Sequence, residues 1–249
     1  MTASGRWRHV LLILAFVAPL ALLLWQPPLA QDPHYHDLAY GRQFFGVPNF
    51  LNVASNVFFL IVGTAGLSFC FHQSAGSAKR AWIVLFAGVA LVAVGSTVYH
   101  WAPSDGTLVW DRLPMTVGFM GLFVALLTEY VSDTLGGLLL PAALVGLFSV
   151  LYWHWLGDLR FYVWIQLLPL LTIPVVMLLY RPAYSHQWLL LIALAWYALA
   201  KVSEIYDEEV FLFTGNFISG HSLKHLLAAT GCLTILWLLK RRERVERPA

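Results

Sequence analysis

The chain has 249 residues, of which 59% are hydrophobic and only 11% are charged. Soluble proteins carry about 25% charged residues, so a soluble domain of this length could not bury so much apolar surface, and lipid must solvate much of the chain. The formal net charge is +2, and the basic residues occupy short connectors, so the sequence predicts no nucleic-acid partner. Cys70 and Cys232 both lie inside apolar runs, which excludes a disulfide framework and a cysteine-based zinc motif.

Apolar runs of membrane-spanning length follow one another along the chain. We place them at residues 10–25, 51–71, 81–100, 112–130, 135–152, 161–180, 188–205 and 222–239. Proline, glycine, serine and aspartate mark the connectors between them. The expected fold is all-α: a polytopic membrane helix bundle of seven core transmembrane helices plus one N-terminal hydrophobic helix or signal segment.

The first apolar run permits two interpretations. Arg6 and Arg8 precede it, and Pro28-Leu29-Ala30 offers a weak small-residue cleavage site, a pattern typical of a signal peptide. An uncleaved first helix fits equally, and we favour it slightly. The chain accordingly divides into a hydrophobic anchor or signal segment at 1–30, a seven-helix membrane domain at 31–240 and a basic tail at 241–249.

Lysine and arginine predict the orientation of the bundle. If the C-terminal tail lies inside, the inner connectors and tails hold Arg6, Arg8, Lys79, Arg80, Arg181, Lys240, Arg241, Arg242, Arg244 and Arg247. The outer side then holds only Arg42, Arg112 and Arg160. This imbalance predicts an integral multi-pass protein with a cytoplasmic C-terminus. The compact chain with short connectors favours a bacterial inner membrane over an internal eukaryotic membrane.

Ionisable residues inside the predicted spans gather at one membrane level. His100 ends the third run, Asp111 comes at the start of the fourth, and His221 and His225 lie at the start of the last. Such residues are costly in lipid, so each one is a functional hypothesis. We expect three helices to bring these groups into one buried site near the outer or lumenal side.

The spacing of these residues points to a metal site. His221 and His225 are four residues apart and share one helix face, so both imidazoles can bind one metal ion. Ser96 lies four residues before His100 and projects from the same face. Three histidines and a water form a standard catalytic zinc shell, beside which Asp111 could act as a base or as an outer-shell partner.

Structural explanations are also open for each of these residues. A His-x-x-x-His pair alone is a weak signal of metal binding. Asp111 could be an N-cap, and Ser96 could bond back to the carbonyl one turn earlier. Lys224 could reach the membrane interface, or pair with Glu204 or Asp207.

Several stretches together resemble the alkaline ceramidases, which belong to a superfamily of seven-helix membrane hydrolases that includes the progestin and adiponectin receptors. They are Val94–His100, Trp110–Met115 and Gly220–His225. Asn49–Asn56 also resembles the family's entry into its first core helix. The resemblance extends over residues 45–240, which is nearly the whole chain.

The resemblance implies a role for each matching residue. His100, His221 and His225 would bind Zn²⁺, Asp111 would orient or deprotonate the zinc-bound water, and Ser96 would donate to the developing oxyanion. The implied reaction is hydrolysis of the amide in ceramide or a related N-acyl lipid, which would enter from the bilayer. The oligomeric state is left open.

Two features of the chain depart from the family pattern. The region at 32–37 and Asn49 lack the acidic run that resembles a calcium site in the animal enzymes, so we do not expect calcium. Arg112 replaces the usual glutamate and would alter the charge at the site entrance and the headgroup accepted. Two other functions compete: a lipid-binding receptor that keeps the zinc site, and a transporter. A transporter would favour ionisable residues at mid-depth in several helices, and the sequence shows few.

Overall fold

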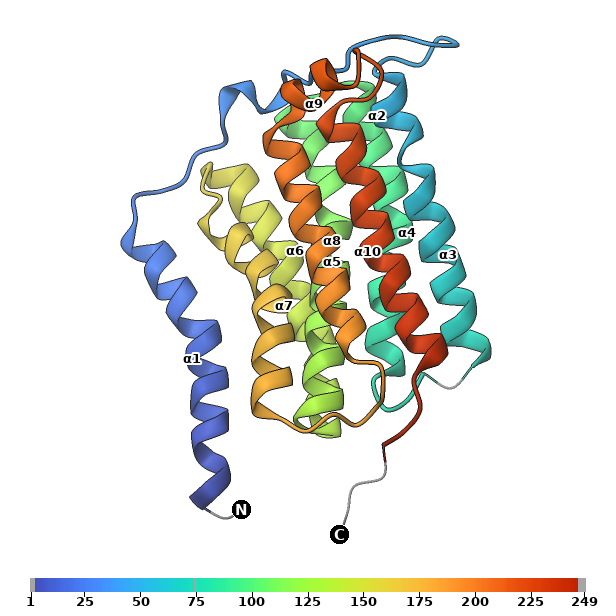
Figure 1. Cartoon of the computed structure of the whole chain (residues 1–249). Coiled ribbons are helices and arrows are strands. Elements are labelled where there is room, and N and C mark those ends of the chain that lie inside the picture. The colour runs from blue at the N-terminus through green and yellow to red at the C-terminus, as the bar shows by residue number, and fades with distance from the viewer. Residues whose placement is uncertain (1–2, 74, 246–249) are drawn as a thin grey trace.

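The chain folds into a bundle of long helices. The computed structural model describes residues 3–73 and 75–245. Its long helices run side by side (Figure 1). Within these described residues, eight helices are long and apolar enough to cross a membrane. The helical elements are α1 (Ala3–Trp25), η1 (Pro33–His36), α2 (Phe50–Ala54), α3 (Val57–His72), α4 (Lys79–Trp101), α5 (Asp105–Tyr130), η2 (Asp133–Leu138), α6 (Leu139–Leu156), α7 (Arg160–Leu179), α8 (Trp188–Ile205), α9 (Asp207–Phe213) and α10 (Gly220–Arg241). The predicted all-α polytopic membrane bundle is confirmed.

Helix α5 begins earlier than the hydrophobic run predicts, at Asp105 instead of residue 112. A capping box starts it: Ser104 Oγ accepts from the Thr107 amide at 3.2 Å, and Thr107 Oγ1 accepts from the Ser104 amide at 3.1 Å. Polar capping residues carry no hydropathy signal, so the first turns were missed. Asp111 therefore lies inside the helix, and its interpretation as an N-cap is wrong.

Helix α1 lies at the edge of the bundle, against α7 (Figure 1). The indole Nε1 of Trp164 donates to the carbonyl of Phe16 at 2.9 Å, and Tyr180 Oη lies 3.0 Å from His9 Nδ1. The linker that follows α1 is held by Asp158, which accepts from the Leu29 amide at 3.2 Å. Hydrogen bonds from the Arg160 guanidinium hold the pKa of Asp158 below its usual range. Whether α1 is cleaved stays a prediction.

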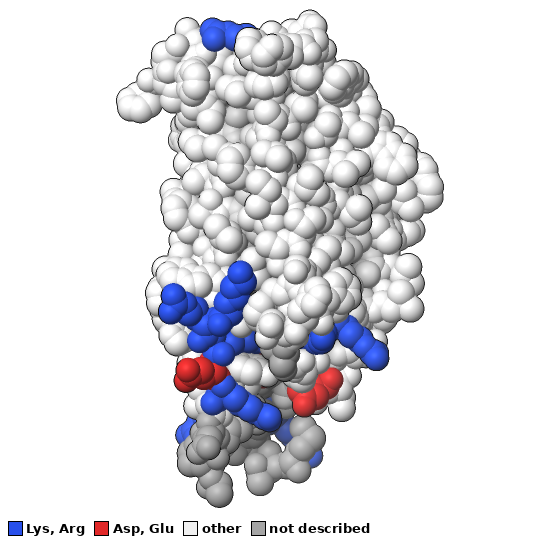
Figure 2. Space-filling view, turned by 90° about the vertical axis from the view of Figure 1, so that its right-hand side faces the viewer, with Lys and Arg blue, Asp and Glu red and all other residues white. Residues whose placement is uncertain are grey.

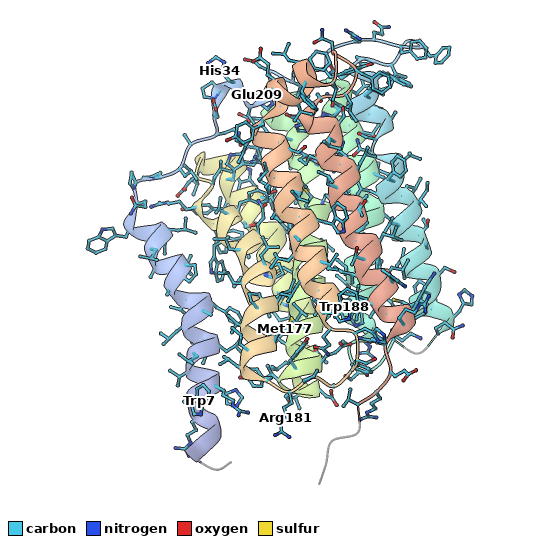
Figure 3. The ribbon with its side chains drawn as sticks, in the orientation of Figure 1. Trp7, His34, Met177, Arg181, Trp188 and Glu209 are labelled. Carbon is cyan, nitrogen blue, oxygen red and sulfur yellow. The ribbon has the colours of Figure 1, made fainter. Side chains whose placement is uncertain are left out.

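The two ends of the bundle differ in charge. The start of α1 and the end of α10 lie at the same end of the bundle (Figure 1), and on the face drawn in Figure 2 most lysine and arginine side chains gather there. Trp7 and Arg181 lie at this end, whereas His34 and Glu209 lie at the opposite end (Figure 3). We call the end that carries His34 and Glu209 the site end.

Two glycines allow the helices around the site to approach each other closely. A Cβ on Gly95 of α4 would lie 2.0 Å from the carbonyl oxygen of Trp110 on α5. A Cβ on Gly220 of α10 would lie 2.0 Å from the carbonyl oxygen of Ser203 on α8. Backbone contact of this kind needs small residues in a membrane bundle. It sets the positions of His100, Asp111 and His221, which lie within one or two turns.

One buried ion pair lies at the end opposite the site. Glu129 of α5 accepts from Arg242 Nη1 at 2.9 and 2.7 Å and from Trp82 Nε1 at 2.8 Å. Arg242 Nη2 also donates to the carbonyl of Ala75 at 2.7 Å. The prediction that ionisable groups of the spans use only one membrane level is therefore wrong. This pair joins the segment after α10 to α4 and α5.

Candidate metal centre

The three predicted histidine ligands meet in one buried cluster at the site end. His100 lies in the last turn of α4, and His221 and His225 lie in the first two turns of α10. Their exposed fractions are 0%, 4% and 3%. The ring centroids are 4.8 to 5.0 Å apart. One nitrogen from each ring lies within 4.8 Å of the other two, so the cluster can hold a metal ion.

The spacing of two ring nitrogens suits a metal, and a hydrogen bond to the third ring favours the tautomer that a metal requires. His100 Nε2 and His221 Nε2 are 3.2 Å apart, and two nitrogens bound tetrahedrally at about 2.0–2.1 Å from zinc are separated by roughly this distance. Ser55 Oγ donates to the Asn52 carbonyl at 3.2 Å and lies 2.8 Å from His225 Nδ1. Because its proton is used, Ser55 accepts from Nδ1–H, which leaves the His225 Nε2 lone pair free for a metal.

Polar residues before α3 support the cluster from behind. Asn49 Nδ2 donates to the carbonyl of His100 at 2.9 Å. Asn52 is fully buried, its Nδ2 donates to the Tyr40 carbonyl at 3.1 Å, and its Oδ1 accepts from Ser222 Oγ at 2.5 Å. In the sequence, the stretch Asn49–Asn56 was notable only for its resemblance to the ceramidase family. Its bonds to α4 and α10 join residues far apart in the chain and were not predicted.

Ser96 and Asp111 lie together beside the histidines. Ser96 is 1% exposed and Asp111 is 8% exposed. Both line a cavity of about 440 Å³ with His225. Within the described ranges no hydrogen bond joins Ser96 to the carbonyl of Val92, so the alternative of a back-bonded serine finds no support. The hydroxyl and the carboxyl instead face the space next to the cluster.

The same cavity continues among the helices as an apolar chamber. Its walls come from α4, α5, α7, α8 and α10 and include Leu85, Val89, Val92, Leu122, Ile173, Ala193, Leu194, Ala228, Cys232 and Ile235. Most of the polar residues in the lining lie at the site end, and Gln166 of α7 and Tyr197 of α8 line the cavity further into the bundle. A largely apolar cavity with convergent polar groups toward one end is the usual form of a ligand site.

A network of charges borders the cluster on the α8 side. Lys224 Nζ donates to Glu204 Oε1 at 2.8 Å, and Lys201 also pairs with Glu204. Of the two partners considered for Lys224, Glu204 is the one that forms an ion pair with it. Tyr35 Oη donates to Glu204 at 3.3 Å; burial, and then the nearby carboxylate, raises the pKa of this phenol. Lys224 Nζ is also 3.1 Å from His221 Nε2. Because a metal would need the lone pair of that nitrogen, Lys224 would pair with Glu204 alone when a metal is bound.

Asp207 has a structural role. Its Oδ1 accepts from the backbone amide of His221 at 2.6 Å, and its Oδ2 accepts from the amide of Ala39 at 2.9 Å. The amide of His221 is one of the free donors in the first turn of α10. Asp207 therefore fixes the start of the histidine helix against the segment before α2, instead of joining the ion pairs of Lys201 and Glu204.

Fold and site together define the class of protein. It is an integral multi-pass membrane protein whose bundle encloses three histidines able to hold a metal ion. Comparison of the chain with family models, with curated proteins and with solved structures found no match.

Proposed function

We propose that the protein is a zinc-dependent membrane amidase of the alkaline ceramidase type, which hydrolyses ceramide or a related N-acyl lipid. The observation that carries this proposal is the cluster of three buried histidines, of which His225 lines one apolar cavity together with Ser96 and Asp111. Amide hydrolysis needs an activated water, a proton carrier and an oxyanion donor, and this group of residues can supply all three.

Zinc is the metal that best fits the donor set. Three imidazoles with a fourth position left for water are a common catalytic zinc shell, and the Nε2 separation of 3.2 Å suits it. When bound, zinc supplies Lewis-acid chemistry that lowers the pKa of water and polarises a carbonyl. His100, His221 and His225 would hold it, and Ser55 would keep His225 in the tautomer required.

Asp111 and Ser96 would carry out the remaining steps. The Asp111 carboxylate takes a proton from the attacking water as the water oxygen bonds to the amide carbon. Asp111 then returns that proton to the amine nitrogen when the carbon–nitrogen bond breaks, giving a fatty acid and an amine. The Ser96 hydroxyl donates to the carbonyl oxygen, where negative charge develops only in the transition state.

The apolar chamber fits an acyl chain, whose transfer from the equally apolar bilayer changes the hydrophobic free energy little. The substrate would enter laterally from the bilayer. The basic end of the bundle would face the cytoplasm by the positive-inside rule, and the site end would then lie at the outer leaflet of a bacterial inner membrane.

Removal and replacement of the metal tests the proposal. Purified protein in detergent should release fatty acid from an N-acyl lipid, lose this activity on exhaustive chelation and regain it with zinc but not with magnesium, which prefers oxygen ligands. Release that persists in metal-free protein would contradict the mechanism. Tight lipid binding by zinc-loaded protein without any release would favour a receptor instead.

A further inference from the structure

Arg112 is a buried cation at the site end whose polar atoms are incompletely used. It follows Asp111 on α5, and its exposed fraction is 5%. Its guanidinium carbon lies 4.0 Å from the ring centroid of Trp153 and 4.8 Å from that of Tyr162. Nη2 donates to Gln31 Oε1 at 2.6 Å. Among residues 3–73 and 75–245, no carboxylate pairs with Arg112, and its buried Nη1 has no acceptor.

Arg242, whose side chain is also buried, shows how a guanidinium with a full set of partners is bound in this bundle. Arg242 also lies over aromatic rings, 4.1 Å from the centroid of Tyr184 and 5.7 Å from that of Trp82. Unlike Arg112, it binds both carboxylate oxygens of Glu129. A buried cation without a counter-charge is costly, and aromatic faces offset only part of that cost. Arg112 therefore has the surroundings of a structural arginine but lacks the anion.

The position of Arg112 at the cavity explains why no carboxylate of the described residues pairs with it. Arg112 lines the same cavity as Ser96, Asp111 and His225. A guanidinium matches the planar oxygens of a carboxylate or phosphate, to which it donates parallel hydrogen bonds. An anion that enters the cavity with a ligand would thus meet a preformed partner.

The charges around the cavity also favour an anionic ligand. The cationic side chains in its lining are Lys201, Lys224 and Arg112, and the acidic ones are Asp32, Asp111 and Glu204. These formal charges cancel. A divalent ion on three neutral histidines would then leave an excess of positive charge, and Glu204 is already shared by two lysines.

We propose that Arg112, held by Gln31 and the rings of Trp153 and Tyr162, is an oxyanion subsite that binds a carboxylate or phosphate on the amine portion of the substrate. The inference rests on the proposed amidase function, since it places the acyl chain in the apolar chamber and the amine portion at the polar end. The substrate class is then an acidic N-acyl lipid, such as an N-acyl amino acid or a phosphorylated N-acyl amino alcohol.

Three probes with the same acyl chain test the charge preference: an N-acylglycine, an N-acylethanolamine and the O-phosphate of that ethanolamide. Their binding is measured calorimetrically on zinc-loaded Asp111→Asn protein, so that no turnover is needed, and kcat/KM is measured on the unmodified protein. We expect at least one acidic probe to bind about tenfold or more tightly than the ethanolamide, which corresponds to about 1.4 kcal/mol. Inorganic phosphate, which lacks an acyl chain, should not displace N-acylglycine.

Substitutions then assign the preference to Arg112. Arg112→Gln should bring the ratio of the affinities for the acidic probe and the ethanolamide close to one, with the metal content retained. Arg112→Lys, which keeps the charge without the planar guanidinium, should lose part of the preference for the acidic probe. Arg42→Gln is the matched control, because Arg42 is exposed at the same end and contacts Phe211 outside the cavity. Its ratio should equal that of the unmodified chain.

The outcomes separate the two proposals. Equal affinity of all three probes for folded, zinc-loaded protein would overturn the subsite even if Arg112→Gln does not fold. A preference that survives in Arg112→Gln would overturn it as well. A preference for acidic probes in a protein that releases no fatty acid would support the subsite and contradict the amidase. Hydrolysis of all probes at one rate would do the reverse.

Discussion

Replacing Asp111 with asparagine is expected to slow hydrolysis of the N-acyl lipid strongly while the metal stays bound. The amide of asparagine keeps the size of the side chain but neither accepts a proton from water nor returns one to the leaving amine. General acid–base catalysis contributes typically about 10²–10⁴-fold in rate, and kcat should fall by that factor. The residues that could hold the metal are the three histidines and do not include Asp111, so the metal content should not change.

Asp105→Asn is the matched control for this experiment. Asp105 begins the same helix but is exposed, contacts His36 Nε2 at 3.3 Å and does not line the cavity. The rate should therefore stay close to that of the unmodified protein. Full activity of Asp111→Asn would contradict the role assigned to this carboxyl, whereas loss of both activity and metal would make it a part of the metal site.

Replacing Glu129 alone is expected to destabilise the whole bundle. Both side chains of the Glu129–Arg242 pair are 5% exposed, so Glu129→Leu would leave a buried guanidinium without its counter-charge. Breaking such a pair costs about 3–5 kcal/mol, and the free energy of unfolding in detergent should fall by this amount. Wild-type zinc content at low temperature would show that the distant site is intact.

The double variant Glu129→Leu, Arg242→Met separates loss of the pair from exposure of one buried charge. With both charges removed the loss should be much smaller, because apolar replacement of a buried pair is often neutral. Glu243→Gln, at an exposed position of the same tail, should leave the free energy of unfolding almost unchanged. A single variant as stable as the unmodified chain would show that the pair contributes nothing.

Hydropathy was enough to predict the spans, because a membrane helix must be apolar over its whole length. The run predicted at 188–205 coincides with α8. The early start of α5 was missed, since Ser104 and Thr107 begin the helix through hydrogen bonds that leave no mark on hydropathy. Errors of this kind occur at helix ends, where polar residues replace apolar ones.

The pair of His221 and His225 was predictable because its spacing is local, and the two residues share a face by helical geometry alone. His100 ends another predicted run at the same membrane level. The supporting residues had no such signal. Ser55 meets His225 across the bundle, and the rings over Arg112 come from α6 and α7, so both contacts depend on how distant helices pack.

The metal content of the purified protein, measured beside the double variant His221→Ala, His225→Ala, decides whether the cluster is a zinc site. We predict one zinc per chain in the unmodified protein and none in the double variant, which should still fold as a helical bundle. A well-folded protein without metal, or a variant that keeps its zinc, would contradict the assignment and remove the basis for the proposed hydrolysis.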